Sequence, residues 1–396
     1  MRIGLETPVH NLKEYTMHSM HTIGRSIGFS ITAILASTVA GDTLHVPADY
    51  QLIQEAIDAA DAGDEVILAP GVYTDSFAFK EDHIVVRSAE GPATTILDGS
   101  AYMDYATVYF PPFSSGELHG VTVRDHEHSY TGAVTIKRCV ATVADCIFED
   151  NRNYFAGSAL RIDSVSLGDT FEVEVRGCTF RRNESSDWGG ALSASLWEED
   201  DLRIANCLFE DNTSGAGGHM LLNPNGPGCH VVVEQCTFRN GSGDEIAGMR
   251  IVNEGIQAEG FNDVDLLDCT FEDHDGIGVH VQGEVHLTLD GDEFRNTGAP
   301  AVALLWPSTA DVANSSFCSG GGIYAISGLW TDLGGNTFSD SCDCPGDGTG
   351  DGQVSTADLL GLLAAWDTGD VDWDFDASGT VDVADLLILV AGWGMC

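Results

Sequence analysis

The sequence predicts an all-β protein, a right-handed parallel β-helix, followed by a small α-helical calcium module. Two observations lead to this prediction. A phrase of the form Cys-x-Phe-x-x-Asn recurs at intervals of one coil, and two aspartate-rich loops near the end have calcium-ligand spacing. We therefore divide the 396 residues into a leader over 1–40, a coil over 41–341 and a calcium module over 342–396.

The repeat is clearest at its phenylalanines, which stand 21 to 33 residues apart. A turn of a parallel β-helix takes about 20 to 30 residues, and each turn buries its inward side chains only by stacking on its neighbours. On this spacing we expect about nine turns between Glu65 and Asp340. The repeated phenylalanines are Phe148, Phe180, Phe209, Phe238, Phe271, Phe294, Phe317 and Phe338.

The cysteine and the phenylalanine of each phrase alternate, so both point inward from a strand. We interpret the cysteines as a buried column of small apolar side chains rather than disulfides or metal ligands. Cys139 and Cys229, each seven residues before a column cysteine, are the better candidates for local disulfides. The asparagine that ends the phrase suits a turn, where it tolerates the αL conformation and bonds stacked backbone groups. The column cysteines are Cys146, Cys178, Cys207, Cys236 and Cys269.

The start of the coil carries its own pattern. Ile53, Ala56, Ile57 and Ala60 have helical spacing, and the strand-like stretch 63–73 follows them. This arrangement resembles the start of pectate-lyase-like β-helices (pectin-lyase-like solenoids), in which a helix caps the open end. A cap is required physically because an uncovered first turn exposes a sheet edge and the apolar interior.

A second repeated phrase, Gly-Gly-Ala-Leu at 189–192, has looser copies at 157–160 and 217–220. Paired with the Phe-x-x-Asn phrase, it resembles the passenger repeats of chlamydial polymorphic outer-membrane proteins, which are surface adhesins. The resemblance covers about a hundred residues and implies a similar coil geometry.

The leader has the features of an export signal. A short apolar stretch over 27–40 follows Arg25 and ends in Thr38-Val39-Ala40, a small-residue pattern that signal peptidase cleaves. Met17 or Met20 would start a signal of ordinary length. The stretch is too short to span a bilayer comfortably, and no later stretch is long enough. We therefore expect a secreted or cell-surface protein without a membrane span.

The charge excludes some partners. Asp and Glu total 62 against 17 Lys and Arg, a formal net charge of -45. Such a field repels nucleic acid, anionic membranes and polyanionic glycans. We expect no nucleic-acid partner.

The composition changes at the C-terminal end, where residues 343–396 hold eleven Asp and no Lys, Arg or Glu. Two 12-residue loops place oxygen-bearing side chains at positions 1, 3, 5, 9 and 12, glycine at position 6 and a backbone carbonyl ligand at position 7, which is the EF-hand pattern for Ca²⁺. An apolar helix is expected after each loop. The predicted ligands are Asp347, Thr349, Asp351, Gln353, Ser355 and Asp358, then Asp374, Asp376, Ser378, Thr380, Asp382 and Asp385.

The duplicated loop, the single following helix and aspartate at position 12 resemble a type I dockerin. The resemblance implies a cohesin-like partner, contacted through Thr356, Ala357, Val383 and Ala384. These residues differ between the two copies, so attachment to a cell-surface component and an intramolecular cap stay open as alternatives. Cys344 and Cys396 bracket the module and are candidates for a disulfide.

A catalytic site is not evident. Signatures of polygalacturonase-like hydrolases are absent as a set, and the clusters 125–128 (Asp-His-Glu-His) and 273–275 (Asp-His-Asp) fall in predicted turns, where we expect solvated surface. Arg161, Arg203 and Arg250 lie at strand positions, but with so few cations a uronate site is not expected.

These observations favour a secreted scaffold that binds a carbohydrate or a surface and attaches to a partner through its calcium-loaded module. A polysaccharide lyase or a glycoside hydrolase with a non-standard active site is the alternative, and a purely structural surface component is the third class.

Overall fold

The computed structural model describes residues 41–101, 105–164, 171–197, 199–226, 228–253, 261–298, 300–318, 325–339, 346–349, 353–376 and 378–395. The predicted leader, the predicted ligand Asp351 and the cysteines Cys342, Cys344 and Cys396 lie outside these ranges. Within the described part, no helix has the length and apolar character needed to cross a bilayer.

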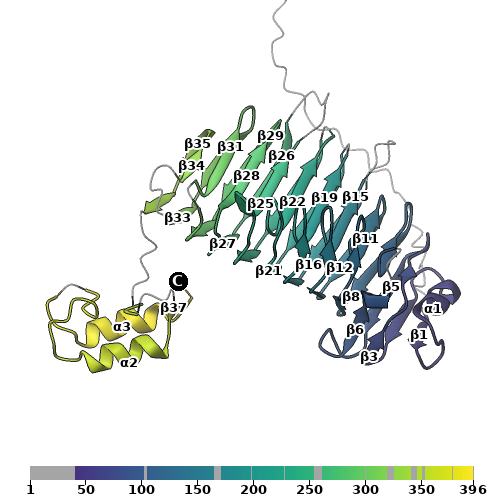
Figure 1. The fold of residues 1–396 in the computed structure, drawn as a ribbon, viewed down its shortest axis with the longest axis horizontal. Coiled ribbons are helices and arrows are strands. Elements are labelled where there is room, and N and C mark those ends of the chain that lie inside the picture. Colours follow the sequence, from purple (N-terminus) through teal and green to yellow (C-terminus); the bar gives the residue numbers. More distant parts are fainter. Residues whose placement is uncertain are drawn as a thin grey trace, which may run out of the picture. The chain divides into compact units, whose positions relative to one another are not determined.

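The coil is a stack of parallel strands, as expected (Figure 1). Each turn runs through sheet A, sheet B and sheet C in that order, and three turns add a strand of the short sheet D between sheets B and C. Every strand of a sheet pairs in parallel with the equivalent strand of the next turn. This is a parallel β-helix.

The twelve strands of sheet A are β1 Thr43–Val46, β2 Glu65–Leu68, β5 Ile84–Ser88, β8 Ser115–His119, β12 Val140–Ala144, β16 Glu172–Arg176, β20 Asp201–Ala205, β23 His230–Glu234, β26 Asn262–Leu267, β29 Val285–Asp290, β32 Thr309–Ala313 and β35 Leu329–Gly334. The eleven strands of sheet B are β3 Gly71–Tyr73, β6 Thr95–Asp98, β9 Thr122–Arg124, β13 Ile147–Glu149, β17 Thr179–Arg181, β21 Leu208–Glu210, β24 Thr237–Arg239, β27 Thr270–Glu272, β30 Glu293–Arg295, β33 Ser316–Cys318 and β36 Thr337–Ser339.

The ten strands of sheet C are β4 Phe77–Ala78, β7 Val108–Phe110, β11 Val134–Lys137, β15 Leu160–Asp163, β19 Leu192–Leu196, β22 Met220–Pro224, β25 Ile246–Val252, β28 Ile277–Gln282, β31 Val302–Leu305 and β34 Ile326–Ser327. Sheet D holds β10 Glu127–His128, β14 Arg152–Asn153 and β18 Glu184–Ser185. The remaining elements are α1 Ile53–Ala59, the 3₁₀ turn η1 Gly99–Ala101, and, in the C-terminal module, β37 Gln353–Val354, α2 Thr356–Ala364, α3 Val383–Ala391 and β38 Gly394–Met395.

The number of turns is higher than expected. Of the twelve sheet A strands in the described residues, only β1 precedes Glu65, which leaves eleven turns instead of nine. The early turns were missed because they lack the repeated phenylalanine. Val123 pairs with Phe148 in register, and Leu97 pairs with Val123, so smaller side chains continue the same inward column.

The phenylalanine column forms the centre of the core. From Phe148 to Phe338 successive rings stack with centroids 4.6 to 5.1 Å apart and planes within 11° of parallel. All but Phe338 are essentially inaccessible to solvent. The strand spacing of about 4.8 Å in a parallel sheet imposes this ring separation. The predicted inward column of phenylalanines is confirmed.

The five column cysteines are buried free thiols, as predicted. The prediction that Cys139 and Cys229 form local disulfides is wrong, because both are free and buried. Burial raises the pKa of each of these two thiols to about 11, so they are protonated and unreactive at neutral pH. Among the described cysteines, Cys318 is disulfide-bonded.

Asparagines form a buried ladder at the turn after sheet B. The amide Nδ2 of Asn151 donates to Oδ1 of Asn183 at 3.0 Å, and that of Asn183 donates to Oδ1 of Asn212 at 3.0 Å. The αL conformation falls on the preceding residue, such as Asp150 (φ 58°), and not on the ladder asparagine. Among the asparagines of the phrase, Asn240 itself is αL (φ 53°). The expected bonding to stacked backbone groups is confirmed, since Nδ2 of Asn183 also donates to the carbonyl oxygen of Phe148 at 3.0 Å.

Histidines continue this polar column at both ends. The backbone N–H of His126 donates to Oδ1 of Asn151 at 3.1 Å, and Nδ1 of His219 lies 3.1 Å from Nδ2 of Asn212. His274 accepts the N–H of Gly241 at 3.2 Å and lies 5.2 Å from the ring of His219. Burial lowers the pKa of all three imidazoles, to about 4 for His126 and about 3 for His274.

The cap at the start of the coil is confirmed. Helix α1 buries Ile53, Ala56 and Ile57 and contacts β1, β2 and β4. Figure 1 shows it at the β1 end of the coil. The C-terminal module has a separate small core around Leu362 and Leu389, one from each of its two helices.

We predict that Phe209→Ala lowers the free energy of unfolding by about 3 to 5 kcal/mol, because it opens a cavity between two stacked rings in a core that cannot collapse around it. Denaturant titration of the purified protein measures this change. Phe113→Ala is the matched control, since this ring is 59% exposed, and its effect is expected below about 1 kcal/mol. Equal losses for both variants would contradict the stacked core.

We also predict an acid sensitivity that depends on His274. Its pKa is depressed in the folded state, so below the ordinary imidazole pKa of 6.5 the unfolded chain binds the extra proton. Stability is therefore complete above about pH 6.5 and falls by up to about 1.4 kcal/mol per pH unit towards pH 3.

The substitution His274→Asn tests this, because an asparagine oxygen at the ladder position can accept the same Gly241 N–H without titrating. The difference in stability between the variant and the wild type should grow in favour of the variant as the pH falls from 6.5. The control is His230→Asn, whose side chain is 47% exposed. Parallel pH profiles for all three proteins would refute the role of His274.

Candidate functional site

The structure separates the residues of the two histidine clusters. In both clusters the carboxylates are exposed, while His126 and His274 are buried inside the turn and His128 is half-buried. Nδ1 of His126 lies 3.2 Å from the buried hydroxyl of Thr107. The expectation of solvated histidines is therefore wrong for His126 and His274, because these positions continue the inward asparagine ladder. Their burial also separates these two imidazoles from the exposed carboxylates, so neither can form an acid–base pair with them.

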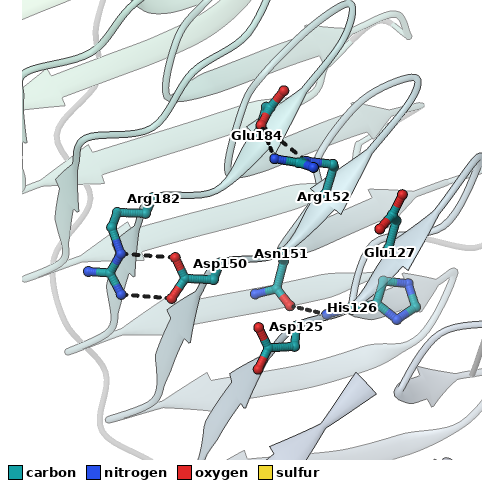
Figure 2. A pocket seen from close by; sticks show the side chains of 8 residues that line it. All are labelled: Asp125, His126, Glu127, Asp150, Asn151, Arg152, Arg182 and Glu184. Atoms are coloured by element: carbon teal, nitrogen blue, oxygen red, sulfur yellow. Dashed lines mark hydrogen bonds and ion pairs between the residues drawn. The ribbon is translucent and has the colours of Figure 1, made fainter. Parts of the chain in front are cut away.

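A cavity of about 270 Å³ lies beside the first cluster, lined by residues of sheet D and of the turns that lead from sheet B to sheet D (Figure 2). The two arginines that line it, Arg152 and Arg182, form ion pairs with carboxylates of the same chain. Figure 2 shows Arg182 donating two hydrogen bonds to Asp150, at 2.9 and 2.8 Å, and Arg152 donating to Glu184 at 2.7 Å. Burial and the nearby Asp98 raise the pKa of Asp125. This cavity is an acidic, internally paired surface without a free cationic donor among the residues that line it.

The outer face of sheet C offers a different environment. A column of outward-pointing residues runs from strand to strand in register through Arg161, Ser193, Leu221, Arg250 and His280. These residues lie on β15, β19, β22, β25 and β28, which follow one another along the coil (Figure 1). The column therefore extends over five successive turns.

Two adjoining cavities lie along this column, one of about 210 Å³ and one of about 360 Å³. Arg250 lines both, so we treat them as one groove, the sheet C groove. Ser193 and Leu221 point outward yet are only 5% and 8% exposed, because the rim covers them. The groove is lined by Phe155, Ala156, Arg161, Trp188, Ser193, Ser195, Leu221, Asn223, Arg250 and Val252, then by Gly215, Ala216, Asp244, Glu245, Ile246, His280 and Gln282.

The rim of the groove comes from the glycine-rich phrases found in the sequence. Trp188 pairs with Ala156 and Ala216 of the neighbouring turns and directly precedes Gly189. Gly189 has φ 56°, and a Cβ there would lie 2.4 Å from the carbonyl oxygen of Leu192. Only glycine fits this bend, which turns the chain from the rim into sheet C. The Gly-Gly-Ala phrase thus positions an aromatic side chain over the groove.

The aromatic rim is joined to the first arginine. The rings of Phe155 and Trp188 meet edge to face, with centroids 5.5 Å apart. The guanidinium of Arg161 lies 5.5 Å from the Phe155 centroid, and its Nε donates to both oxygens of Asp163 at 3.1 and 2.9 Å. These contacts hold the arginine in one orientation, and its buried Nη1 has no hydrogen-bond partner in the described part of the chain.

The groove concentrates buried polar atoms that have no hydrogen-bond partner in the described part of the chain. Nη1 of Arg161, Oδ1 of Asn223, Nε of Arg250 and Nδ1 of His280 are such atoms. A buried polar atom without a partner costs about 1 to 3 kcal/mol, so groups of this kind are normally satisfied by water or a ligand. Their presence in adjoining cavities makes the groove the candidate binding site.

His280 sits beside Arg250 on the next strand. Burial lowers its pKa, and the positive charge of Arg250 lowers it further, while Glu245 acts weakly in the opposite direction. His280 is therefore neutral at physiological pH and able to accept a proton or a hydrogen bond.

The sequence identified part of this groove. Arg161 and Arg250 were noted as strand residues, but Arg203 is in sheet A, ion-paired with Glu174 and Glu234. The rim was missed, although two of the three glycine-rich phrases follow an aromatic residue within two positions, Phe155 and Trp188, and this pattern could have indicated it.

The second predicted calcium loop has the geometry of a cation site. Carboxylate oxygens of Asp374, Asp376 and Asp385 lie within 4.8 Å of one another. Asp385 is buried and accepts the backbone N–H groups of Asp376 and Asp382 at 3.2 and 2.7 Å, which fixes its orientation at the start of α3. Hard oxygens in this arrangement fit Ca²⁺.

The first loop is arranged in the same way at its last position. Asp358 is buried and accepts hydrogen bonds from the backbone of Thr349 and Ser355, at 3.0 and 2.8 Å. Burial opposes its ionisation, but these hydrogen bonds lower its pKa to about 2. Asp358 is thus held as a carboxylate. Asp347 lies 3.1 Å from the Thr349 hydroxyl, while Asp351 lies outside the described residues.

The remaining predicted ligands are placed as follows. Ser355 and Asp382 are the N-cap residues of α2 and α3, and each side chain accepts the N–H two residues later. Ser378 donates its N–H to Asp374 at 3.0 Å, and its hydroxyl contacts the carbonyl oxygen of Thr380 at 3.2 Å. Gln353 is described by its backbone alone, in β37.

No model of a known protein family matches the chain, and no curated protein matches it. Solved structures do match. Pectate lyase Pel9A has 14% sequence identity and a TM-score of 0.50, over 83% of this chain and 81% of that chain. Geobacillus virus E2 ORF18 has 14% identity and a TM-score of 0.41, over 72% and 55%. The pectin methylesterase from Aspergillus niger has 10% identity and a TM-score of 0.38, over 78% and 92%. The similarity to the pectate lyase shows that the coil has the pectate-lyase-like parallel β-helix fold.

Proposed function

We propose that this is a secreted glycan-binding protein that holds a polysaccharide chain in the sheet C groove. The observation that supports this most directly is the set of four unpartnered buried polar atoms along adjoining cavities. The aromatic rim adds apolar surface for the carbon–hydrogen faces of sugar rings, and the serine and asparagine side chains on the floor add hydrogen-bonding groups for hydroxyls. A groove that crosses several turns suits an extended polymer.

The C-terminal module completes the proposal. It would hold Ca²⁺ in its two loops and attach the coil to a cohesin-like protein or a cell-surface component. Support comes from the carboxylate group of the second loop and from exposed apolar side chains on the module's helices. Leu360 and Leu363 of α2 and Leu387 and Val390 of α3 are each at least 50% exposed, which is a surface suited to a protein partner.

Cleavage of the bound glycan is the second candidate. The observation that favours it is the neutral His280 beside Arg250, in a cavity that Asp244 and Glu245 also line. A neutral imidazole is a suitable general base, and paired carboxylates serve hydrolysis. Assays for unsaturated products and for new reducing ends on the bound glycan separate a lyase, a hydrolase and a binding protein.

We predict that Trp188→Ala weakens glycan binding about 10-fold or more without lowering the melting temperature by more than a few degrees, because the ring covers the groove and not the core. The binding partner is found first on a panel of polygalacturonate, alginate, xylan and cellulose oligosaccharides. Calorimetry then measures the affinities. Trp306→Ala is the matched control, since this tryptophan is 90% exposed and lies outside the groove. Equal affinities for the two variants would refute the groove.

We predict that the wild-type protein binds two Ca²⁺ ions in a calorimetric titration, and that Asp385→Ala reduces the number to one because it removes a buried, preoriented ligand. Excess chelator should change the fluorescence of Trp366 and Trp373, which pack against the small core of the module. Asp370→Ala, outside both loops, serves as the control. A wild-type titration without heat of binding would exclude the calcium module.

A further inference from the structure

We propose that the sheet C groove selects glycans that carry carboxylate groups, with Arg250 as the main residue that binds the carboxylate and Arg161 as a second one. This inference rests on the proposed glycan-binding function and names the class of glycan. It reverses the expectation drawn from the net charge of -45, which predicts repulsion of polyanionic glycans.

The distribution of the cations supports this choice. Most described arginines are ion-paired with carboxylates of the same chain, and in the described ranges Lys137 and Arg250 have no carboxylate within the 4.0 Å limit of an ion pair. Both lie on sheet C. In a chain with 17 basic and 62 acidic residues, a partly buried arginine without such a partner is exceptional.

The residues that line the smaller cavity also favour an anionic ligand. They include both Arg161 and Arg250, and no acidic residue of the described ranges lines this cavity, although acidic residues line the cavity beside Asp125 and the adjoining one beside His280. Each of the two guanidiniums keeps a buried N–H nitrogen without a partner. A planar carboxylate matches the fork of donors that a guanidinium presents, so a bound carboxylate satisfies these atoms directly.

The spacing of the two arginines fits an extended ligand. Arg161 and Arg250 belong to one register column and are separated by the strands of Ser193 and Leu221. Three strand spacings of about 4.8 Å place their backbones about 14 Å apart along the coil. A polymer that runs along the coil axis can therefore present two of its carboxylates at once. We assign the larger contribution to carboxylate binding to Arg250, because the Nε of Arg161 already donates to the carboxylate of Asp163.

The net charge does not prevent this binding. At 0.1 M salt, interactions between exposed charges are largely screened beyond about 10 Å, so a ligand in the cavity interacts mainly with the groups that line it. The long-range repulsion from the acidic surface affects the rate of approach more than the contacts in the groove.

The experiment compares polygalacturonate oligosaccharides with their methyl esters, which have the same sugar ring and no charge, and repeats the comparison with alginate oligosaccharides and their carboxyl-reduced forms. We expect at least one acidic form to bind about 10-fold or more tightly than its neutral counterpart. Arg250→Gln should remove this preference, so that the acidic and neutral forms bind with similar affinity. Arg203→Gln, whose arginine is ion-paired in sheet A, is the control.

A second readout reports the contact itself. Because the charge of Arg250 lowers the pKa of His280, a carboxylate bound to Arg250 should raise that pKa, while a neutral glycan should not. An NMR titration of the imidazole with and without ligand measures the shift.

The outcomes separate the two proposals. Equal binding of acidic and neutral forms, or full preference retained in Arg250→Gln, would overturn carboxylate recognition and leave the groove as a glycan site. If no oligosaccharide of the wider panel binds, or if binding ignores Trp188→Ala, the glycan-binding function itself fails.

Discussion

The structure depends on one constraint, the stacking of equivalent side chains between turns that are about 4.8 Å apart. Phenylalanine rings, asparagine amides and cysteine thiols each form a column, because parallel pairing in register places equal positions of successive turns directly over one another. Phenylalanine rings stack at nearly the strand spacing. An asparagine side chain can donate a hydrogen bond to the asparagine of the next turn while its own amide oxygen accepts one from the asparagine of the preceding turn. The interior is thus repetitive, and one turn cannot form it alone.

The same register creates the candidate site on the outside. Inward positions repeat the same residue type because equivalent side chains stack on one another, whereas outward positions can differ between turns. One outward column therefore contains basic, polar and apolar side chains, namely Arg161, Ser193, Leu221, Arg250 and His280. The rim adds a second layer, because the αL glycine after Trp188 turns the chain back towards sheet C. The regularly stacked core thereby positions a groove whose lining residues differ from turn to turn.

Electrostatics divide the surface by sheet. On sheets A and B, described arginines are neutralised by carboxylates of the same strand, such as Arg295 by Glu293, or of neighbouring turns, such as Arg203 by Glu174 and Glu234. On sheet C, Arg250 keeps an unpaired buried nitrogen next to a histidine that its charge holds neutral. A net charge describes the field far from the protein, while the lining of a cavity decides which ligand it accepts.

The sequence by itself determined the coil, the helical cap, the inward columns and the carboxylate cluster of the second acidic loop, because each follows from local spacing that any fold must respect: a period near one turn, alternation along a strand, and oxygens at fixed loop positions. It did not determine the number of turns, the state of Cys139 and Cys229, the burial of His126 and His274, or the groove. These depend on which turns stack and in which register. Arg161 and Arg250 are 89 residues apart in the chain, and only the tertiary structure aligns them on one face.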